Sequence, residues 1–268
     1  MTSRDAAAPA ARPGGNFPFY APAMRTDEFM DAACPLMAGM AAPWYFAKAT
    51  SARGRDLGLR TMHFYFLGRG GVLGDVEAPV VASAFGYFKP AHVERMWDEA
   101  RAIAEPRATA RAYLECCAAF GRACLGEVEG LDAFCEAAAA INDAADPTGL
   151  ALYAGISAEP LADDAPGRAL QLASVLRELR GSAHLLAVVA SGLDSNVAHL
   201  IRRPEAFTAF GWEADEAPAV SDADRAKLDA AEALTGELIA PVFSVLDDAD
   251  RRAMVGTLER MQAAIAAA

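Results

Sequence analysis

The feature that most limits the possible folds of this chain is an internal repeat in its sequence. Arg69-Gly70 is followed by Val80-Val81-Ala82-Ser83, by a glycine at position 86, and by a segment that contains Ala91-His92-Val93. The same order returns in the second half: Arg180-Gly181, Val188-Val189-Ala190-Ser191, Gly192, and a segment with Val197-Ala198-His199. The two Val-Val-Ala-Ser runs are 108 residues apart. Four small residues recur easily in an alanine-rich chain, so the shared order is the stronger signal.

Apolar residues recur every three to four positions along almost the whole chain, and strand-forming runs are scarce, so the pattern predicts a mainly α-helical protein. Pro90 and Pro106 mark helix starts, and Gly58, Gly126 and Gly192 mark helix ends. The helices are expected near residues 26–40, 43–57, 59–69, 77–86, 91–104, 107–124, 129–144, 163–179, 181–191, 195–203, 221–245 and 247–266.

Each repeat unit therefore reads as helix, glycine turn, helix, which is the helix-turn-helix pattern. Each unit is followed by a pair of long amphipathic helices. The pattern therefore predicts two winged-helix-like halves in a single chain, arranged like the two subunits of a two-fold symmetric dimer. We expect a disordered N-terminal arm at 1–22, a first half at 23–148 and a second half at 149–268. Short extended pieces at Leu150 to Ile156 and Phe210 to Trp212 are expected to be remnants of the wings.

Composition narrows the classes of function. A net charge of −12 opposes general attraction to nucleic acid, whose binding depends on neutralising phosphates with Lys and Arg. No apolar run reaches the length of a membrane span, and the first residues lack the apolar core of a signal peptide, so no membrane association and a cytoplasmic location are expected. The five cysteines form no CxxC pair, as expected for reduced thiols in a cytoplasmic protein.

The sequence resembles an actinobacterial family of helix-turn-helix-like proteins, and its second half looks like regulators of the MarR type. The resemblance rests on Phe64 to Arg69 leading into Val72-Leu73-Gly74, and on Phe85 to Pro90. In the second half it rests on Leu176 to His184, which continues into Gly192-Leu193-Asp194 and Ala198-His199-Leu200. The family implies no established activity. Leu179 and Ser182 replace a histidine and an acidic residue that are usual in the family, Phe64 replaces a glycine and Gly236 replaces an aspartate, so a role that depends on those groups is not expected here.

One helix face in the second half carries the candidate chemistry. Arg177, Arg180 and His184 are spaced i, i+3 and i+7 and share a face, with Glu178 at its edge. Such a face suits an anionic ligand, with His184 as the candidate catalytic acid or base. Alternatively, the arginines tie the two halves together through protein carboxylates.

Arg69 is the repeat mate of Arg180 and follows an aromatic run in which Tyr65 and Phe66 are candidates for the wall of an apolar pocket. The alternative for these rings is ordinary core packing. His63, beside the same run, is expected to be structural. The sequence thus predicts a pocket between the halves for an acidic or carbonyl-bearing small molecule, with Arg69, Arg180, Tyr65, Phe66, Arg177 and Glu178 as ligand-binding residues.

No cofactor motif is present. The four histidines never occur at i, i+4, and no cysteine or carboxylate completes a ligand spacing, so a metal site is not expected. A haem held by one histidine leaves no motif, so the cofactor stays unknown. Whether the protein is an enzyme also stays open.

Three functions remain at this stage. The first is a small-molecule-binding or catalytic protein on a MarR-like scaffold that has lost DNA binding. The second is a MarR-type, ligand-responsive transcription regulator with recognition helices near 91–103 and 195–203, for which the acidic residues of the first helix are unfavourable, so specific DNA binding is not expected. The third is an interaction scaffold without a ligand. Either a monomer or a homodimer is compatible with the sequence.

Overall fold

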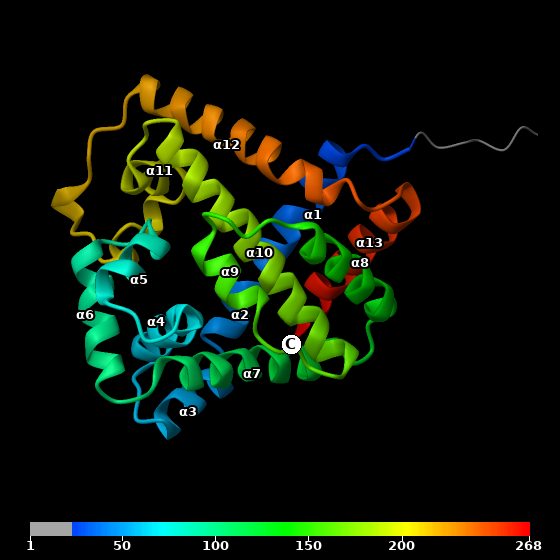
Figure 1. The fold of residues 1–268 in the computed structure, drawn as a ribbon, viewed down its shortest axis with the longest axis horizontal. Coiled ribbons are helices and arrows are strands. Elements are labelled where there is room, and N and C mark those ends of the chain that lie inside the picture. Colours follow the sequence, from blue (N-terminus) through cyan, green and yellow to red (C-terminus); the bar gives the residue numbers. More distant parts are fainter. Residues whose placement is uncertain (1–22) are drawn as a thin grey trace, which may run out of the picture.

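The computed structural model describes residues 23–268, and within that range every regular element is helical (Figure 1). The predicted mainly α-helical class is therefore confirmed, whereas the expected disordered arm lies outside the described residues. The α-helices are α1 (Thr26–Gly39), α2 (Ala41–Tyr45), α3 (Lys48–Asp56), α4 (Thr61–Gly70), α5 (Ala78–Phe85), α6 (Pro90–Arg101), α7 (Pro106–Leu125), α8 (Leu131–Ala144), α9 (Ala151–Ser157), α10 (Ala165–Ala190), α11 (Ser195–Arg202), α12 (Asp222–Phe243) and α13 (Asp248–Ala267). Short 3₁₀ turns are η1 (Gly71–Leu73), η2 (Pro204–Ala206), η3 (Thr208–Phe210) and η4 (Ala214–Glu216).

Helix α10 runs through the middle of the molecule and organises the helices around it (Figure 1). It begins where the Asp164 side chain accepts a hydrogen bond from the Gly167 backbone N–H, with Pro166 in its first turn. It packs against α7, α8, α9 and α12, and also against α1. Because most of its residues up to Leu179 are buried, α10 is hydrophobic on nearly every side, as a central helix must be.

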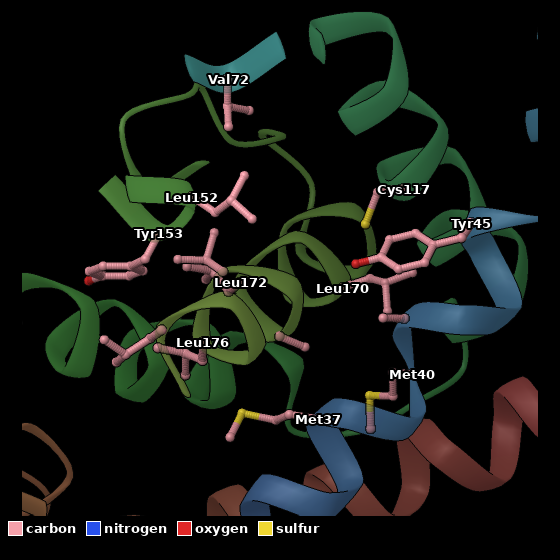
Figure 2. Packing of buried hydrophobic residues seen from close by; sticks show 14 of the residues in the cluster. Met37, Met40, Tyr45, Val72, Cys117, Leu152, Tyr153, Leu170, Leu172 and Leu176 are labelled. Atoms are coloured by element: carbon pink, nitrogen blue, oxygen red, sulfur yellow. The ribbon is translucent and has the colours of Figure 1, made fainter. Parts of the chain in front are cut away.

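The two ends of the described chain lie together, since α1 packs against α12 and α13. One hydrophobic core joins residues from both predicted halves, including Met37 of α1 and Met40 directly after it, with Leu170 and Leu176 of α10 (Figure 2). A smaller core lies between the end of α10, α11 and α12. The proposed division into 23–148 and 149–268 stays a prediction, because both segments contribute to the same core.

The repeated sequence folds into two helix–glycine–helix units. Helix α5 leads through Gly86 into α6, and α10 leads through Gly192 into α11; both glycines have positive φ, at 53° and 66°. The axes of α10 and α11 differ by 117°, within the range of helix-turn-helix units. The flanking Arg-Gly pairs differ, because Arg69 lies at the end of the separate helix α4 whereas Arg180 lies inside α10.

Three local predictions are wrong. The predicted helix end near position 180 does not exist, because α10 continues through Gly181; a glycine inside a helix costs only about 1 kcal/mol, which tertiary packing readily offsets. The expected wing remnant at Leu150 to Ile156 is mostly helix α9, and the one near Phe210 is the turn η3 followed by Gly211. Residues 23–268 contain no strand, because these short segments pack as helical turns rather than pairing with each other.

Residues 23–268 contain no candidate for a membrane-spanning helix that stands by itself. No single helix has both the length and the apolar content to cross a bilayer; α10 and α11 reach that content only as a pair, across their sharp bend.

Candidate functional site

A cavity of about 230 Å³ lies where α1, α4, α5 and α9 meet the last turns of α10 and the helix α11. Residues from both predicted halves, 23–148 and 149–268, form its walls. The residues that line it are Cys34, Met37, Ala38, Tyr65, Arg69, Ala84, Phe85, Tyr87, Phe88, Leu152, Leu176, Arg177, Glu178, Arg180, Gly181, Ser182, His184, Leu185, Ala198, His199, Arg202, Arg203 and Phe210.

Glu178 is the most strongly bound polar side chain of the cavity. Its two carboxylate oxygens accept hydrogen bonds from Nε and Nη2 of Arg69, at 3.0 and 2.9 Å, in the two-pronged geometry that arginine favours. Arg177, the residue directly before Glu178, donates a further bond from Nη1 to Oε1 at 2.5 Å. The side chain of Glu178 is 5% exposed and that of Arg69 is 15% exposed, so this cluster joins α4 to α10 in the interior.

The charges of this cluster are held in place by their own neighbours. Burial alone raises the pKa of Glu178, but the guanidinium groups of Arg69 and Arg177 outweigh burial and lower that pKa to about 2. Arg69 also donates from Nη1 to the Tyr65 hydroxyl at 3.1 Å, and its guanidinium lies 4.7 Å from the centre of the Phe85 ring. Glu178 is therefore ionised near neutral pH.

A second charged cluster lies around Glu232 of α12, beside the cavity. Glu232 accepts a hydrogen bond from Arg180 Nη2 at 2.9 Å and lies 2.6 Å from Arg202 Nη2. Its Oε1 atom is also 3.5 Å from His184 Nε2. One carboxylate thus connects α10, α11 and α12, and it is more accessible than Glu178, with 26% of its side chain exposed.

The protonation of His184 follows from its contact with α12. The Thr235 hydroxyl donates its single proton to the Ala231 carbonyl at 2.6 Å and therefore accepts at its oxygen from His184 Nδ1, 3.0 Å away. The proton of the neutral ring is thus on Nδ1, and Nε2 carries the lone pair. Burial lowers the pKa of His184 and the two nearby arginines lower it further, although Glu232 raises it.

Aromatic rings form another part of the cavity wall. The Phe88 and Phe210 rings stack with centroids 4.0 Å apart, and Phe210 stacks on His199 at 3.8 Å. Tyr87 lies between the two histidines, with its ring centroid 6.3 Å from that of His184 and 6.3 Å from that of His199. The cavity therefore has a cationic side built by arginines and an aromatic side built by Tyr87, His199 and the two phenylalanines.

The structure brings six of the seven residues named from the sequence to this one cavity: Arg69, Arg180, His184, Tyr65, Arg177 and Glu178. Phe66 is not among the lining residues. Its side chain is fully buried and packs against Phe85, Phe88 and the His92 ring. The reason is helical geometry, because residues i and i+1 point in different directions and Tyr65 already faces the cavity.

Sequence reasoning missed four contributors to the site: Tyr87, His199, Arg202 and Glu232. The signal for Arg202 was its place three residues after His199, on the same face of α11. Glu232 and Thr235 share a face of α12 in the same way, but no local pattern says which helix that face meets. His63 lies elsewhere, with its Nε2 atom 3.0 Å from Glu99.

Comparison with known proteins identifies a family but no individual relative. A family model described as a helix-turn-helix family matches residues 32–268, which is most of the chain. The chain belongs to this helix-turn-helix family. No curated protein and no solved structure is similar enough to be matched with it.

In this helix-turn-helix protein the basic residues of α11 lie toward the cavity. His199 and Arg202 line it, as does Arg203 directly after the helix, with His199 buried and both arginines exposed to solvent. In the other unit, α6 mixes Arg95 and Arg101 with the acidic residues of its exposed face. Within residues 23–268, no group of three or more histidine, cysteine or acidic side chains is arranged to hold a metal ion.

Proposed function

We propose that this helix-turn-helix family member binds a small organic anion in the cavity and has lost specific DNA binding. The observation that best supports this proposal is the charge of the cavity compared with that of the whole chain. The chain has a net charge of −12, yet five arginines and a single carboxylate line the cavity. Positive charge concentrated in a concave, partly apolar site favours an anionic ligand. An acidic or carbonyl-bearing molecule fits this description.

The arginines differ in their freedom to bind a ligand. Arg69 and Arg177 donate hydrogen bonds to the buried Glu178, whereas Arg180 donates to the more accessible Glu232. Arg203 has no ion pair within residues 23–268. The proposed anion site is therefore the end of the cavity formed by Arg180, Arg202 and Arg203, and the Arg69 cluster is its rigid floor.

A reaction at this site would use His184. Its Nε2 atom carries a lone pair, and its lowered pKa keeps the ring neutral, which suits a general base near neutral pH. The same proposal includes the arrangement of the chain as two MarR-like halves that imitate a dimer. The two helix–glycine–helix units support this arrangement. The strands that form a wing in winged-helix proteins are absent from residues 23–268.

A ligand-responsive transcription regulator is the second candidate. The observation in its favour is the 117° angle between α10 and α11, which is the geometry of a DNA-reading unit, together with the family match. In that case ligand binding at Arg202 would change the position of α11. The two candidates differ in one measurable property, which is sequence-specific affinity for duplex DNA.

The test of anion binding is calorimetric titration of the whole protein with three carboxylates of increasing size: butyrate, hexanoate and phenylacetate. We expect saturable binding of at least one, and at least a tenfold loss of affinity in Arg180→Ala and in His184→Ala with helical content unchanged by circular dichroism. Arg122→Ala is the matched control, because Arg122 forms an exposed ion pair with Asp164 away from the cavity. Equal affinity in Arg180→Ala and the parent would reject the site.

A further inference from the structure

Two buried polar atoms of the cavity residues have no hydrogen-bond partner. They are the Tyr87 hydroxyl and Nε2 of His199, and neither finds a partner within residues 23–268. His199 is only 7% exposed. Buried polar atoms are nearly always paired in folded proteins, because leaving one unpaired costs about 1–3 kcal/mol. Two such atoms on neighbouring rings of one cavity indicate a group that is missing from it.

The position of these atoms is specific to the cavity. Five other residues in the described part of the chain also carry an unpartnered buried atom, and none of them lines the cavity: Trp44, His63, His92, Glu232 and Arg251. Of these, Glu232 Oε1 lies 2.6 Å from Arg202 Nη2 in an ion pair. The rings of Tyr87 and His199 are neighbours, with centroids 6.3 Å apart, and both residues line the cavity. This pair lies on the aromatic side, next to the Phe210 ring that stacks on His199.

Both groups are neutral near pH 7. Burial raises the pKa of the Tyr87 phenol, and burial lowers the pKa of His199 despite the opposing contact of its ring with the Ala206 backbone. A neutral imidazole has one N–H donor and one acceptor nitrogen, so Nε2 is an acceptor when the ring proton is on Nδ1.

We infer that Tyr87 and His199 form a second subsite, which binds a hydroxyl group of the ligand. The Tyr87 hydroxyl donates to the ligand oxygen, and the ligand hydroxyl donates to His199 Nε2, so that one neutral group satisfies both atoms. This inference rests on the proposed function and adds the chemical class of the ligand: an organic anion that also carries a hydroxyl group. The arginines hold its charged end.

The first test needs no ligand and compares two tyrosines by thermal unfolding. The Tyr153 hydroxyl is outside the cavity and donates to Asn142 at its carbonyl and at Oδ1, at 3.2 and 2.9 Å. Tyr153→Phe is expected to lower the Tm by a few degrees because it removes a satisfied hydroxyl. Tyr87→Phe is expected not to lower it, because it removes an unsatisfied one. An equal loss in both variants would show that the protein itself pairs Tyr87 and would overturn the inference.

The second test measures affinity for matched anions with and without a hydroxyl group: 3-hydroxybutyrate against butyrate, 6-hydroxyhexanoate against hexanoate, and mandelate against phenylacetate. At least one hydroxylated member is expected to bind roughly tenfold more tightly than its partner, since a site built to bond a hydroxyl discriminates against its loss. Tyr87→Phe should reduce that preference below about twofold, and Tyr153→Phe should retain it.

The outcomes separate the two proposals. If anions bind and their affinity falls in Arg180→Ala, but no pair shows a preference for the hydroxylated member, the anion site stands and the hydroxyl subsite is wrong. If the preference exists but persists in Tyr87→Phe, the subsite is also wrong as placed. If none of the six anions binds, the proposed function fails, and this inference fails with it.

Discussion

The contacts of Glu178 bear on the two interpretations of the arginines, which are ligand binding and ties through protein carboxylates. It accepts bonds from Arg69 and Arg177, whose helices are different, and is almost completely buried. Removing one partner of such a group leaves charge uncompensated in the interior, which costs far more than the pair contributes. For Arg69, the interpretation as a tie between helices therefore agrees with its bonds, whereas Arg180 binds the more accessible Glu232.

Glu178→Gln is expected to reduce the free energy of unfolding by about 3–5 kcal/mol, because two buried guanidinium groups lose their counter-charge. Urea denaturation followed by circular dichroism measures this. Glu232→Gln is the comparison variant, and about 1 kcal/mol or less is expected from it, since its carboxylate is partly exposed and screened by solvent. Similar losses in both variants would contradict the anchoring role of Glu178.

The same residue predicts a pH dependence. The pKa of Glu178 falls from 4.5 to about 2 on folding, so its contribution is complete above pH 4.5 and is lost as the pH falls toward 2. The contribution is on the order of 3 kcal/mol. Urea midpoints of the parent between pH 5 and pH 2.5 should fall more steeply than those of Glu178→Gln. Parallel curves would show that Glu178 is not held ionised by its arginines.

At the scale of elements, α10 is the part that most changes the interpretation of the sequence. The helix continues through Gly181, so the face that carries Arg177, Arg180 and His184 is unbroken from the core to the cavity. Gly68 has a different role in α4, because a Cβ there would lie 2.6 Å from the Tyr113 ring. One glycine is thus a weak point of a helix, and the other allows two helices to approach closely.

Two alanine variants test this difference. Gly181→Ala is expected to stabilise the protein by up to about 1 kcal/mol, because the nearest atom to a new Cβ is 4.0 Å away and alanine favours helix. Gly68→Ala is expected to destabilise it by about 1–3 kcal/mol through overpacking. Thermal unfolding of both variants gives the comparison. A destabilised Gly181→Ala would mean that α10 needs a flexible point there.

At the scale of the whole molecule, the distribution of charge separates ligand binding from DNA binding. Duplex DNA is bound by surfaces that neutralise several phosphates and release their counterions. This chain is acidic overall, and Arg202 of α11 is paired with Glu232. The positive charge that a DNA-reading helix needs is thus partly directed to the protein's own cavity.

We therefore expect no sequence-specific binding of duplex DNA at physiological salt. Fluorescence anisotropy with a duplex from the region upstream of the protein's own coding sequence, with a scrambled duplex of equal composition as control, measures this. Both should bind equally weakly or not at all. Submicromolar affinity for the first duplex alone would favour the regulator and overturn the proposed loss of DNA binding.

The sequence by itself determined the helical class, most helix positions and the polar set of the candidate site. Helical periodicity is a local property, so the shared face of Arg177, Arg180 and His184 and the i, i+4 pair of Tyr65 and Arg69 can be read without a structure. Glycine is a local signal for a helix end; it was right at position 192 but gave a false end near position 180, because this local preference is weak compared with burial.

Only the tertiary structure decided which partners these side chains meet. The contacts from Arg69 to Glu178 and from Arg180 to Glu232 join residues 109 and 52 positions apart, and no local pattern specifies which helix faces meet. The same packing buries Phe66 and brings Tyr87 and His199 to the cavity, one from a loop and one from α11. Periodicity fixes the direction of a side chain on its own helix, but the space it faces depends on how the other helices pack around it.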